Sequence, residues 1–391
     1  MTIQQEFIHL FTYKQMQSQN RRAGRGQAPG KLYIGGEYAV LEPGQPAILV
    51  GLNQYIEVTI QISSLVDQGH WQDQTSQKHY DYHRHLGEIQ VSDSYWTYVA
   101  AAIHVVEALI KPDKILDYDI QIQSQLNHQS GPKLGLGSSG AVTVAVIRAL
   151  LDFYGYQANS PKTIYQLAAL AQLIIGSNGS LGDLAAAAYG SWIYYRAVDR
   201  YWLKEQLAQG HSVDLLGKAW PQLEIRYLQV PEDLDLHIGW TQSPASSTHY
   251  VKQIQSQIPN HRSAYQAFLD KSDIAVNSLR KGLEEAKPLL IYQAIHSLKD
   301  NLYDLDAALS LGIMTPHLKQ LVEIAEVKGF VSKSSGAGGG DCGIALGYHH
   351  QNSRALEEAW QAQGIAYLTM AVCPRFDLER TDYESGTRTK E

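Results

Sequence analysis

The chain has 391 residues, and its 39 acidic and 32 basic side chains give a formal net charge of −7. With 44% hydrophobic and 18% charged residues, its composition is that of a soluble globular protein with a large core and two or three domains. The acidic balance argues against a general nucleic-acid binder, which would need a basic face to neutralise phosphates. Two cysteines, Cys342 and Cys373, are too few for a disulfide framework or a Cys-based zinc site, and they fit a reducing compartment.

The apolar runs and the two ends of the chain point to a cytoplasmic protein with no membrane partner. No stretch approaches the roughly 20 apolar residues that cross a bilayer. The N-terminus lacks a basic region followed by a long apolar one, which argues against a secretory signal. Residues 1–27 are polar, and we expect them to form an extension outside the fold. Residues 375–391 are expected to form a polar tail.

The first half of the chain combines alternating strands with apolar helices. Residues 55–62 and 118–126 alternate polar and apolar side chains, which predicts strands with one wet face. Residues 50–53 would close a hairpin in front of the first of these strands. Helices are predicted over four segments, at residues 96–110, 140–154, 164–175 and from 185 onwards. The second of these helices is apolar almost all round, which requires a central, buried position.

Residues 63–94 are polar and show no periodicity, so we expect a long surface insertion there. The segment contains four histidines that could form a metal site: His70, His79, His83 and His85. It has no nearby cysteine and no helical i, i+4 pair, so solvated histidines are the favoured interpretation.

The character of the sequence shifts near residue 221, so we expect a first domain over residues 28–220 and a second over 221–374. The second domain starts with a strand at 235–240 and continues with helices up to residue 328. Three residues delimit the last of these helices: the N-cap Thr315, Pro316 at the first helical position and Gly329 past the end. The remaining predicted elements are strands over 330–333 and 342–346, a helix over 354–363 and a strand over 365–372.

The most informative segment is the glycine- and serine-rich run at residues 133–141, which leads directly into the buried helix. Its glycines allow a ligand to approach the backbone, and the helix start presents unpaired N–H groups and the positive end of the macrodipole. The hydroxyls of Ser138 and Ser139 add oxygen ligands. Together these features predict an anion site for which polyphosphate is the natural guest.

Other interpretations of this run are open. Its Gly-x-Gly-x-x-Gly spacing formally matches a dinucleotide fingerprint, but residues 119–123 alternate where a buried parallel strand would be wholly apolar. No acidic residue ends a second strand about 20 residues later. No lysine follows the last glycine, so it is not a Walker A loop. A tight turn in which a serine caps the helix stays as an alternative for this motif alone.

Three further segments carry candidate binding groups. Residues 333–343 contain five glycines within eight residues, and their backbone N–H groups could form an anion-binding nest or belong to a flexible loop. Residues 176–183 end in Asp183, which could be an ordinary N-cap. Residues 29–38 contain Lys31, a complementary cation or a side chain that snorkels at a strand edge.

Taken together, PGKLYIGGEYAVLEPG, KLGLGSSGAV and KSSGAGGGDCGIAL resemble the three sequence motifs of the GHMP small-molecule kinases, in the same order and spacing. The resemblance covers roughly residues 28–373. It implies a two-domain α+β fold, with a ribosomal protein S5 domain 2-like N-terminal domain and a ferredoxin-like C-terminal domain. The active site would lie in the cleft between them. Within the family, GEYAVLEPGQPA, GSNGSLGDLA and GWTQSPASSTHYV are similar to members that phosphorylate 5-phosphomevalonate.

The resemblance implies transfer of the ATP γ-phosphoryl group to the phosphate of (R)-5-phosphomevalonate, which gives mevalonate 5-diphosphate and ADP in isoprenoid precursor synthesis. The implied cofactor is Mg²⁺, the implied partners are these small molecules alone, and the implied assembly is a monomer or a homodimer. An acceptor phosphate with a second pKa of about 6 is largely ionised at neutral pH. We therefore expect Asp183 to orient Lys31, not to act as a strong base.

The resemblance also implies roles for individual residues. Those that would act on the transferred phosphoryl group are Lys31, Lys133 and Asp183. Those that would bind the ATP phosphates are Gly135, Leu136, Gly137, Ser138, Ser139 and Gly140, and the Ser139 hydroxyl would also bind Mg²⁺. Those that would bind the acceptor are Ser180, Ser246, Ser247, His249, Ser335, Gly336, Ala337, Gly338 and Asp341.

One position departs from the pattern of mevalonate kinases, which are close relatives. They carry a metal-binding Glu eleven residues before the aspartate, where this chain has Gln172. A neutral amide cannot offset the charge of Mg²⁺, which argues against mevalonate kinase and leaves the other metal ligands open. Further alternatives are mevalonate diphosphate decarboxylase, homoserine kinase, galactokinase, a catalytically silent nucleotide-binding regulator and, from the formal fingerprint, a dehydrogenase.

Overall fold

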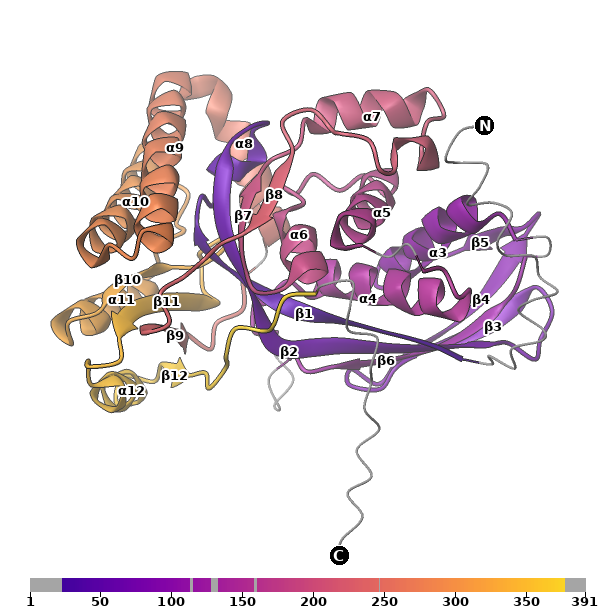
Figure 1. Cartoon of the computed structure of the whole chain (residues 1–391), viewed down its shortest axis with the longest axis horizontal. Helices are drawn as coiled ribbons and strands as arrows, with labels where there is room; N and C mark the ends of the chain where they lie inside the picture. Colours follow the sequence, from indigo (N-terminus) through magenta and orange to yellow (C-terminus); the bar gives the residue numbers. More distant parts are fainter. Residues whose placement is uncertain (1–22, 113–114, 128–132, 158–159, 246, 377–391) are drawn as a thin grey trace, which may run out of the picture.

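The computed structural model describes residues 23–112, 115–127, 133–157, 160–245 and 247–376. Two lobes lie side by side in Figure 1, each built on its own β-sheet. The first sheet has eight strands in the order β5-β4-β3-β6-β2-β7-β8, with β1 paired to β2. The second sheet has four strands in the order β10-β11-β9-β12. Among the described residues, no helix is both long enough and apolar enough to span a lipid bilayer.

The first lobe holds the strands of the large sheet and the helices on one of its faces. Its strands are β1 (Ala23–Gly35), β2 (Pro46–Ile62), β3 (Gln68–Asp73), β4 (Lys78–His85), β5 (Glu88–Gln90), β6 (Tyr118–Ser124), β7 (Trp192–Arg196) and β8 (Glu224–Tyr227). Its helices are η1 (Ala39–Leu41), α3 (Thr97–Ile110), α4 (Ser138–Phe153), α5 (Pro161–Ile174), α6 (Gly182–Tyr189), α7 (Arg200–Ala208) and η2 (Val213–Leu215).

The second lobe contains the smaller sheet with helices on both faces. Its strands are β9 (Leu234–Trp240), β10 (Val331–Ser334), β11 (Cys342–Tyr348) and β12 (Ala366–Tyr367). Its helices are α8 (Ser247–Gln257), η3 (Ile258–Asn260), α9 (Arg262–Glu284), α10 (Pro288–Leu309), α11 (Pro316–Val327) and α12 (Ser353–Gln361). On β11, Ile344 packs with the main core that includes α10, whereas the neighbouring Ala345 packs with α11 and α12. This alternation buries both faces of the sheet.

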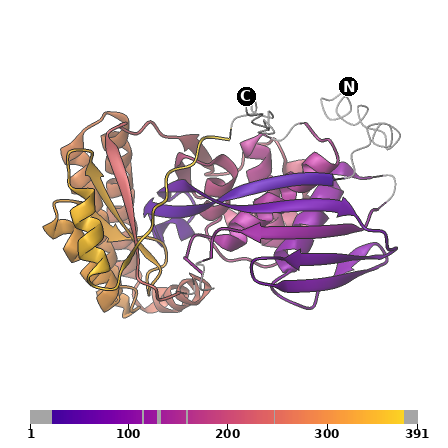
Figure 2. The same cartoon turned by 90° about the horizontal axis from the view of Figure 1, so that it is seen from below.

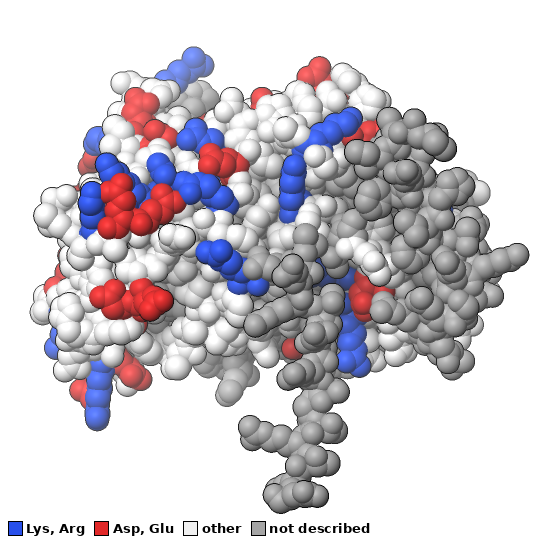
Figure 3. Space-filling model, viewed as in Figure 1, with Lys and Arg blue, Asp and Glu red and all other residues white. Residues whose placement is uncertain are grey.

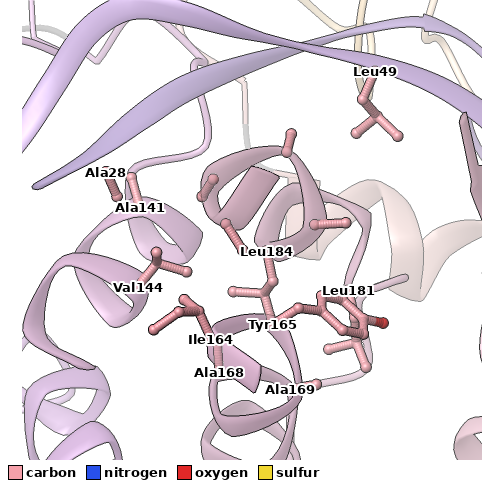
Figure 4. Packing of buried hydrophobic residues seen from close by; sticks show 14 of the residues in the cluster. Ala28, Leu49, Ala141, Val144, Ile164, Tyr165, Ala168, Ala169, Leu181 and Leu184 are labelled. Carbon is pink, nitrogen blue, oxygen red and sulfur yellow. The ribbon is translucent and has the colours of Figure 1, made fainter. Parts of the chain in front are cut away.

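The core of the first lobe lies between the large sheet and the helices behind it. Figure 4 shows Ala28 from β1 above Ala141 and Val144 of α4, with Leu184 of α6 beside them and Ile164 of α5 below. All of these side chains are buried. The predicted central burial of α4 is therefore confirmed, and its N-terminus is fixed beneath the sheet.

The opposite face of the large sheet, seen in Figure 2, carries no helix of the described part of the chain. Exposed polar side chains line it, including Glu57 on β2 and Gln121 and Gln123 on β6. This exposure explains the alternation that predicted these two strands. Figure 3 shows acidic and basic side chains interspersed over the second lobe. Glu284 of α9 pairs with Arg280 on the same helix and with Arg226 on β8 of the first lobe.

The predicted hairpin at residues 50–53 is wrong. Strand β2 continues through this segment, and it pairs with β7 over residues 46–50 and with β6 over residues 56–62. The chain changes partner strands at Gly51 without turning. No turn is needed because β1 follows β2 on its other edge, with Gly51 opposite Lys31.

The expectation of a surface insertion over residues 63–94 is also wrong, because this segment forms strands β3 to β5 and widens the sheet. Trp71 and Tyr82 are fully buried and pack together, and Trp71 also contacts Trp96. Only a few large side chains of this segment point inward, and the many polar side chains on its outer face obscure the two-residue period of a strand in the sequence. The four histidines are exposed, as expected, although they lie on or at the ends of strands.

The boundaries of the predicted domains differ from the structure at the start of the first domain and at the border between the two domains. Strand β1 begins at Ala23, within the predicted extension, because Gly24 and Gly26 let the strand lie against the backbone of α4 with no room for side chains. Strand β8 still belongs to the first sheet, beyond the predicted boundary at residue 220. Residues 1–22 lie outside the described part of the chain.

The last described segment returns to the first lobe. Only Ala366–Tyr367 of the predicted strand 365–372 pairs with β9. The chain then forms isolated bridges from Val372 to Leu52 and from Arg375 to Gly190. The start of the predicted polar tail therefore contacts the end of α6, and residues 377–391 lie outside the described part.

Candidate active site

The first glycine loop, residues 134–140, lies between strand β1 and the start of β11. The backbone N–H of Lys31 donates to the carbonyl of Leu136 at 2.9 Å, and the Cys342 thiol donates to the carbonyl of Leu134 at 3.2 Å. Both contacts join segments that are more than 100 residues apart in the chain. The loop is thus held from both lobes at the point where helix α4 begins.

Three glycines of this loop each make room for one charged side chain. A Cβ on Gly137 would lie 2.9 Å from Cε of Lys31, and a Cβ on Gly140 would lie 2.6 Å from Oδ2 of Asp183. A Cβ on Gly135 would lie 2.6 Å from Oδ2 of Asp341. The glycines thus allow an ammonium group and two carboxylates, all from other segments, to converge on the loop.

Lys31 lies between the two carboxylates. Its side chain is largely buried, its Nζ donates to the carbonyl of Gly135 at 3.3 Å, and it lies 5.4 Å from the ring centroid of Tyr33. Its charge acts on Asp183 and on Asp341 alike. The ammonium group therefore balances two acids and also stands next to the backbone that would face an anion.

The two acids differ in their supporting groups. Burial raises the pKa of Asp183, while Lys31 and the backbone N–H groups of Asp183 and Leu184 act in the opposite direction. Burial also raises the pKa of Asp341, whose Oδ1 accepts from the backbone N–H of Ala245 at 3.0 Å. Asp183 is held by the first turn of α6, and Asp341 by the segment between β9 and α8.

The N-terminus of α4 is open to a ligand. Its N-cap is Gly137 in the left-handed region, and no side chain forms a cap hydrogen bond there. The alternative in which a serine caps this helix is therefore wrong. Ser139 lies close enough to Tyr98 of α3 to affect it: burial together with the charge of Asp183 raises the pKa of Tyr98, and Ser139 acts in the opposite direction. The start of α4, the Ser139 hydroxyl and the Asp183 carboxylate together form a surface that is rich in oxygen atoms and N–H groups.

The third loop, residues 176–181, positions Asp183. Ser180 is buried, its hydroxyl lies 2.9 Å from the Tyr33 hydroxyl, and it accepts from the N–H of Gly182 at 3.2 Å. Arg200 donates to the carbonyls of Asn178 and Gly179 at 2.6 and 2.5 Å. These bonds fix the loop directly before α6, the helix that carries Asp183 in its first turn.

The second glycine loop, residues 335–341, is bonded to both lobes. The Ser335 hydroxyl accepts from the N–H of Tyr33 at 3.1 Å and donates to the carbonyl of the same residue at 2.8 Å. The Tyr38 hydroxyl donates to the carbonyl of Ala337. The hydroxyl of Ser335 is thus engaged by the backbone of β1, and its evident role is to fix the loop.

The remaining predicted site residues lie at the rim or outside the described chain. Lys133 is exposed and forms an isolated bridge with Asn127. His249 is exposed on α8, with its ring 5.4 Å from that of Tyr250. Ser246 lies outside the described residues, and Ser247 begins α8. The structure thus brings Lys31, Asp183 and Asp341 together and leaves Lys133 at the surface.

Sequence reasoning missed one charged pair behind the site. The buried side chains of Lys333 on β10 and Glu37, after β1, form an ion pair, and Lys333 also donates to the carbonyl of Ser334 at 2.6 Å. Both residues stand in the motif segments, but only the fold shows that the two segments touch. Tyr33, Tyr98 and Arg200 were also missed, because no local pattern links them to the loops they contact.

Gln172 is buried behind α4, where a metal-binding carboxylate would stand in mevalonate kinases. Its Nε2 lies 3.4 Å from the Thr143 hydroxyl, which donates to the carbonyl of Ser139 at 2.9 Å. The amide therefore supports the first turn of α4 through Thr143. Among the described residues, no three His, Cys, Asp or Glu side chains come together as a metal cluster.

Comparison with known proteins identifies the family. Residues 97–191 match the GHMP kinases N terminal domain, and residues 279–366 match the GHMP kinases C terminal domain. The chain is 36% identical over 361 residues to a phosphomevalonate kinase from Streptomyces sp. (strain CL190), covering 88% of this chain and 95% of that protein. The chain belongs to the GHMP kinase family, and the predicted family and two-domain fold are confirmed.

Two solved structures share the fold along nearly their whole length. Streptococcus pneumoniae phosphomevalonate kinase in complex with phosphomevalonate and AMPPNP matches with a TM-score of 0.78 and 30% identity, over 89% of this chain and 99% of that one. A Lin0012 protein from Listeria innocua matches with a TM-score of 0.83 and 33% identity, over 90% and 98%.

Proposed function

We propose that this chain is a phosphomevalonate kinase, which transfers the γ-phosphoryl group of ATP to (R)-5-phosphomevalonate and releases mevalonate 5-diphosphate and ADP. The observation that carries this assignment is the 36% identity to the Streptomyces phosphomevalonate kinase over 95% of that enzyme. The geometry agrees with it, since Lys31 and Asp183 meet at a glycine loop that opens a buried helix.

The ATP phosphates would lie along the first glycine loop and the start of α4. The backbone of Gly135–Gly140 would supply N–H groups, and the unpaired N–H groups of the first turn would add the positive end of the helix dipole. Ser138 and Ser139 would contribute hydroxyls. A side chain at Gly137 or Gly140 would displace Lys31 or Asp183, so the loop supports both binding and chemistry.

Phosphoryl transfer needs alignment and charge cancellation more than covalent help. Here the donor and the acceptor are both anionic, so a cation at the point of transfer matters more than a proton acceptor. Lys31 would stabilise the transferring group, and Asp183 would orient Lys31 through its charge.

Mg²⁺ fits the oxygen donors next to the loop. Mg²⁺ prefers a few protein oxygens plus substrate phosphates, and Ser139 and Asp183 would supply a hydroxyl and a carboxylate. When bound, the ion would offset charge on the β- and γ-phosphates. With Gln172 neutral, the protein supplies fewer negative ligands than a mevalonate kinase would, which leaves more of the coordination to the phosphates.

The metal proposal predicts a specific phenotype for Ser139→Ala. The variant should lose about tenfold in kcat and need a higher Mg²⁺ concentration for half-maximal rate, because one oxygen ligand is gone. Titration of Mg²⁺ at saturating ATP measures this. An Mg²⁺ dependence equal to that of the wild type would show that Ser139 serves the helix and not the metal.

The acceptor would lie on the other side of the transfer point, against the second glycine loop. Gly336, Ala337 and Gly338 would face it with their backbone, Ser180 and Ser335 would hold the loops that enclose it, and Asp341 would fix the position of the phosphate loop. Ser246, Ser247 and His249 would bind the acceptor, and the exposed Lys133 would have to reach the transferred phosphoryl group from the surface. We also place the enzyme in the cytoplasm, as a monomer or homodimer, because its two buried free thiols suit a reducing compartment.

A coupled ADP-release assay tests the assignment. The acceptors to compare are phosphomevalonate, mevalonate, mevalonate 5-diphosphate and homoserine, each with ATP and Mg²⁺. Phosphomevalonate should give the highest kcat/KM by at least a hundredfold. A preference for mevalonate would make the chain a mevalonate kinase, and ATP binding without turnover of any acceptor would make it a nucleotide-binding regulator.

A further inference from the structure

A carboxylate outside the cleft holds the loop that follows helix α10. Asp306, in the last turn of α10, accepts three backbone hydrogen bonds: Oδ1 from Gly312 at 2.6 Å and from Ile313 at 3.1 Å, and Oδ2 from Met314 at 3.0 Å. Bonds from N–H groups to an ionised carboxylate are among the stronger hydrogen bonds in proteins. We call residues 310–314 the support loop, and Asp306 fixes its shape.

The support loop in turn contacts the second glycine loop directly. The N–H of Gly339 donates to the carbonyl of Ile313 at 2.7 Å. A Cβ on Gly338 would lie 2.6 Å from that same carbonyl, so the two loops touch without any intervening side chain. A shift of Ile313 would therefore be transmitted directly to Gly338 and Gly339.

The other contacts of the support loop lead to the same region. Gln253 of α8 donates through Nε2 to the carbonyl of Leu311 at 3.2 Å. One turn earlier on α8, the Tyr250 side chain lies directly against Gly339, where no Cβ could fit. Helix α8 and the support loop thus hold opposite sides of the glycine pair.

The two ends of the second glycine loop have separate anchors. Ser335 is fixed by the backbone of Tyr33, and the Asp341 backbone bonds with Thr241 and with the carbonyl of Ser243 at 2.7 Å. The first glycine loop is held by β1 and by Cys342, and among the described residues none of its hydrogen bonds involves the support loop. Loosening the support loop should therefore disturb the middle of the second loop and leave the ATP phosphate loop in place.

We infer that Asp306 is a positioning residue for the acceptor: through the support loop, it sets the placement of Gly338 and Gly339 against phosphomevalonate. This inference rests on the proposed function, in which the second glycine loop faces the acceptor. It makes acceptor affinity depend on a carboxylate that touches neither substrate.

Asp306→Asn tests the inference, because it keeps the size of the side chain but presents an NH₂ group to one of the donors. The KM for phosphomevalonate should rise about tenfold, as expected when a charge-assisted hydrogen bond is lost. The KM for ATP should stay within about twofold of the wild-type value. Asp304→Asn is the matched control on the same helix, since Asp304 is exposed and pairs only with Lys271 in the described contacts; both KM values should stay unchanged.

Amide hydrogen exchange without substrates gives a second readout that does not depend on the reaction. In Asp306→Asn, exchange should speed up at Gly312–Met314 and at Gly339, and stay unchanged in α4. Wild-type exchange at Gly339, or an equal rise in both KM values, would overturn the inference. If Asp306→Asn does not fold, Gln253→Ala loosens the same loop from α8 and should shift the acceptor KM in the same direction, by about threefold.

Failure of the inference differs from failure of the proposed function. If the wild-type chain does not phosphorylate phosphomevalonate, the proposed function is wrong, and the KM comparison is made with the acceptor it does use. A rise in KM for ATP alone would then overturn the positioning role, whereas a rise for that acceptor alone would support it.

Discussion

The two glycine loops look alike in sequence, but their glycines make room for different partners. In the first loop, Gly135, Gly137 and Gly140 lie against the charged side chains of Asp341, Lys31 and Asp183. In the second loop, the equivalent neighbours are neutral: the carbonyl of Ile313, the ring of Tyr250 and the carbonyl of Ser243. The first loop brings charged groups together at one point, whereas the glycines of the second loop pack against neutral groups of its own lobe.

This difference predicts that the first loop serves phosphoryl transfer and that the second loop serves stability and acceptor binding. Charges next to the first loop can act on a polyphosphate, since they are held close to the open end of a helix. The cation directly before the second loop, Lys333, is instead fully buried and paired with Glu37. Substitutions around the first loop should therefore change turnover, and substitutions around the second should change stability and acceptor binding.

The largest expected effect is that of Lys31→Met. Removing the ammonium group at the first loop should lower kcat by about a thousandfold, in the range seen when a preorganised charge at a transferring group is lost. Asp183→Asn should cost less, about a hundredfold, because the orienting charge acts through Lys31. Steady-state kinetics with ATP and phosphomevalonate measures both, and the exposed Lys204→Met is the control with unchanged kcat.

A loss in Asp183→Asn as deep as that in Lys31→Met would contradict this ordering. If the acidic limb of the pH–rate profile also disappeared in Asp183→Asn, the carboxylate would be an obligatory base. The orienting role predicts that the limb persists, since the acceptor phosphate titrates in the same range.

The ion pair of Lys333 and Glu37, behind the second loop, should affect the free energy of unfolding and not primarily turnover. Lys333→Met leaves Glu37 buried without its cation, and the free energy of unfolding should fall by about 3–5 kcal/mol. The double variant Glu37→Gln, Lys333→Met should recover most of this loss, because neither charge is then left unpaired. Denaturant unfolding of both variants and the wild type measures this, and a double variant no more stable than Lys333→Met would contradict the prediction.

Much of the fold followed from local pattern. The helix that begins at Pro316 has a periodic apolar face and clear ends, and α4 is apolar almost all round, so both helices were predicted closely. Strands β3 to β5 were missed because their inward side chains are few, with Trp71 and Tyr82 among many polar neighbours. The unbroken course of β2 depends on a change of partner strand, and no local sequence signal reports that.

The site was predictable where the motif itself carries the chemistry. The glycines of the first loop follow from residue type and spacing, whereas Lys31 and Asp183 were assigned to the site only by the resemblance to the GHMP kinase motifs. The structure brings all of them together. The pair of Lys333 and Glu37 depends on contact between segments almost 300 residues apart, so the sequence alone could not show it. Ser335 fits its motif, but its hydroxyl is occupied by the backbone of Tyr33.

Gly140→Ala tests the position of Asp183 at the first loop by adding a single carbon atom next to its carboxylate. The new Cβ would lie 2.6 Å from Oδ2 of Asp183, so the carboxylate must move while the helical backbone of residue 140 stays favourable. We expect a loss of about 30-fold in kcat with little change in stability. Gly179→Ala is the control, because its Cβ would meet only the Ser177 hydroxyl at 3.7 Å. Wild-type turnover in Gly140→Ala would show that the position of Asp183 is not critical.

The smallest expected effect is on thermal stability, which the buried, ionised carboxylate of Asp183 lowers. Because burial raises the pKa of Asp183 in the folded state, the carboxyl group favours folding below its unfolded pKa of about 3.9, and this contribution is lost as pH rises through the folded pKa. Asp183→Asn cannot ionise, and Lys31 keeps Asp341 as a partner. The variant should therefore unfold at a slightly higher temperature than the wild type at pH 7–8, with the difference shrinking towards acidic pH. Thermal unfolding across this pH range measures the effect, and a variant less stable than the wild type at neutral pH would mean that attraction to Lys31 outweighs the burial of Asp183.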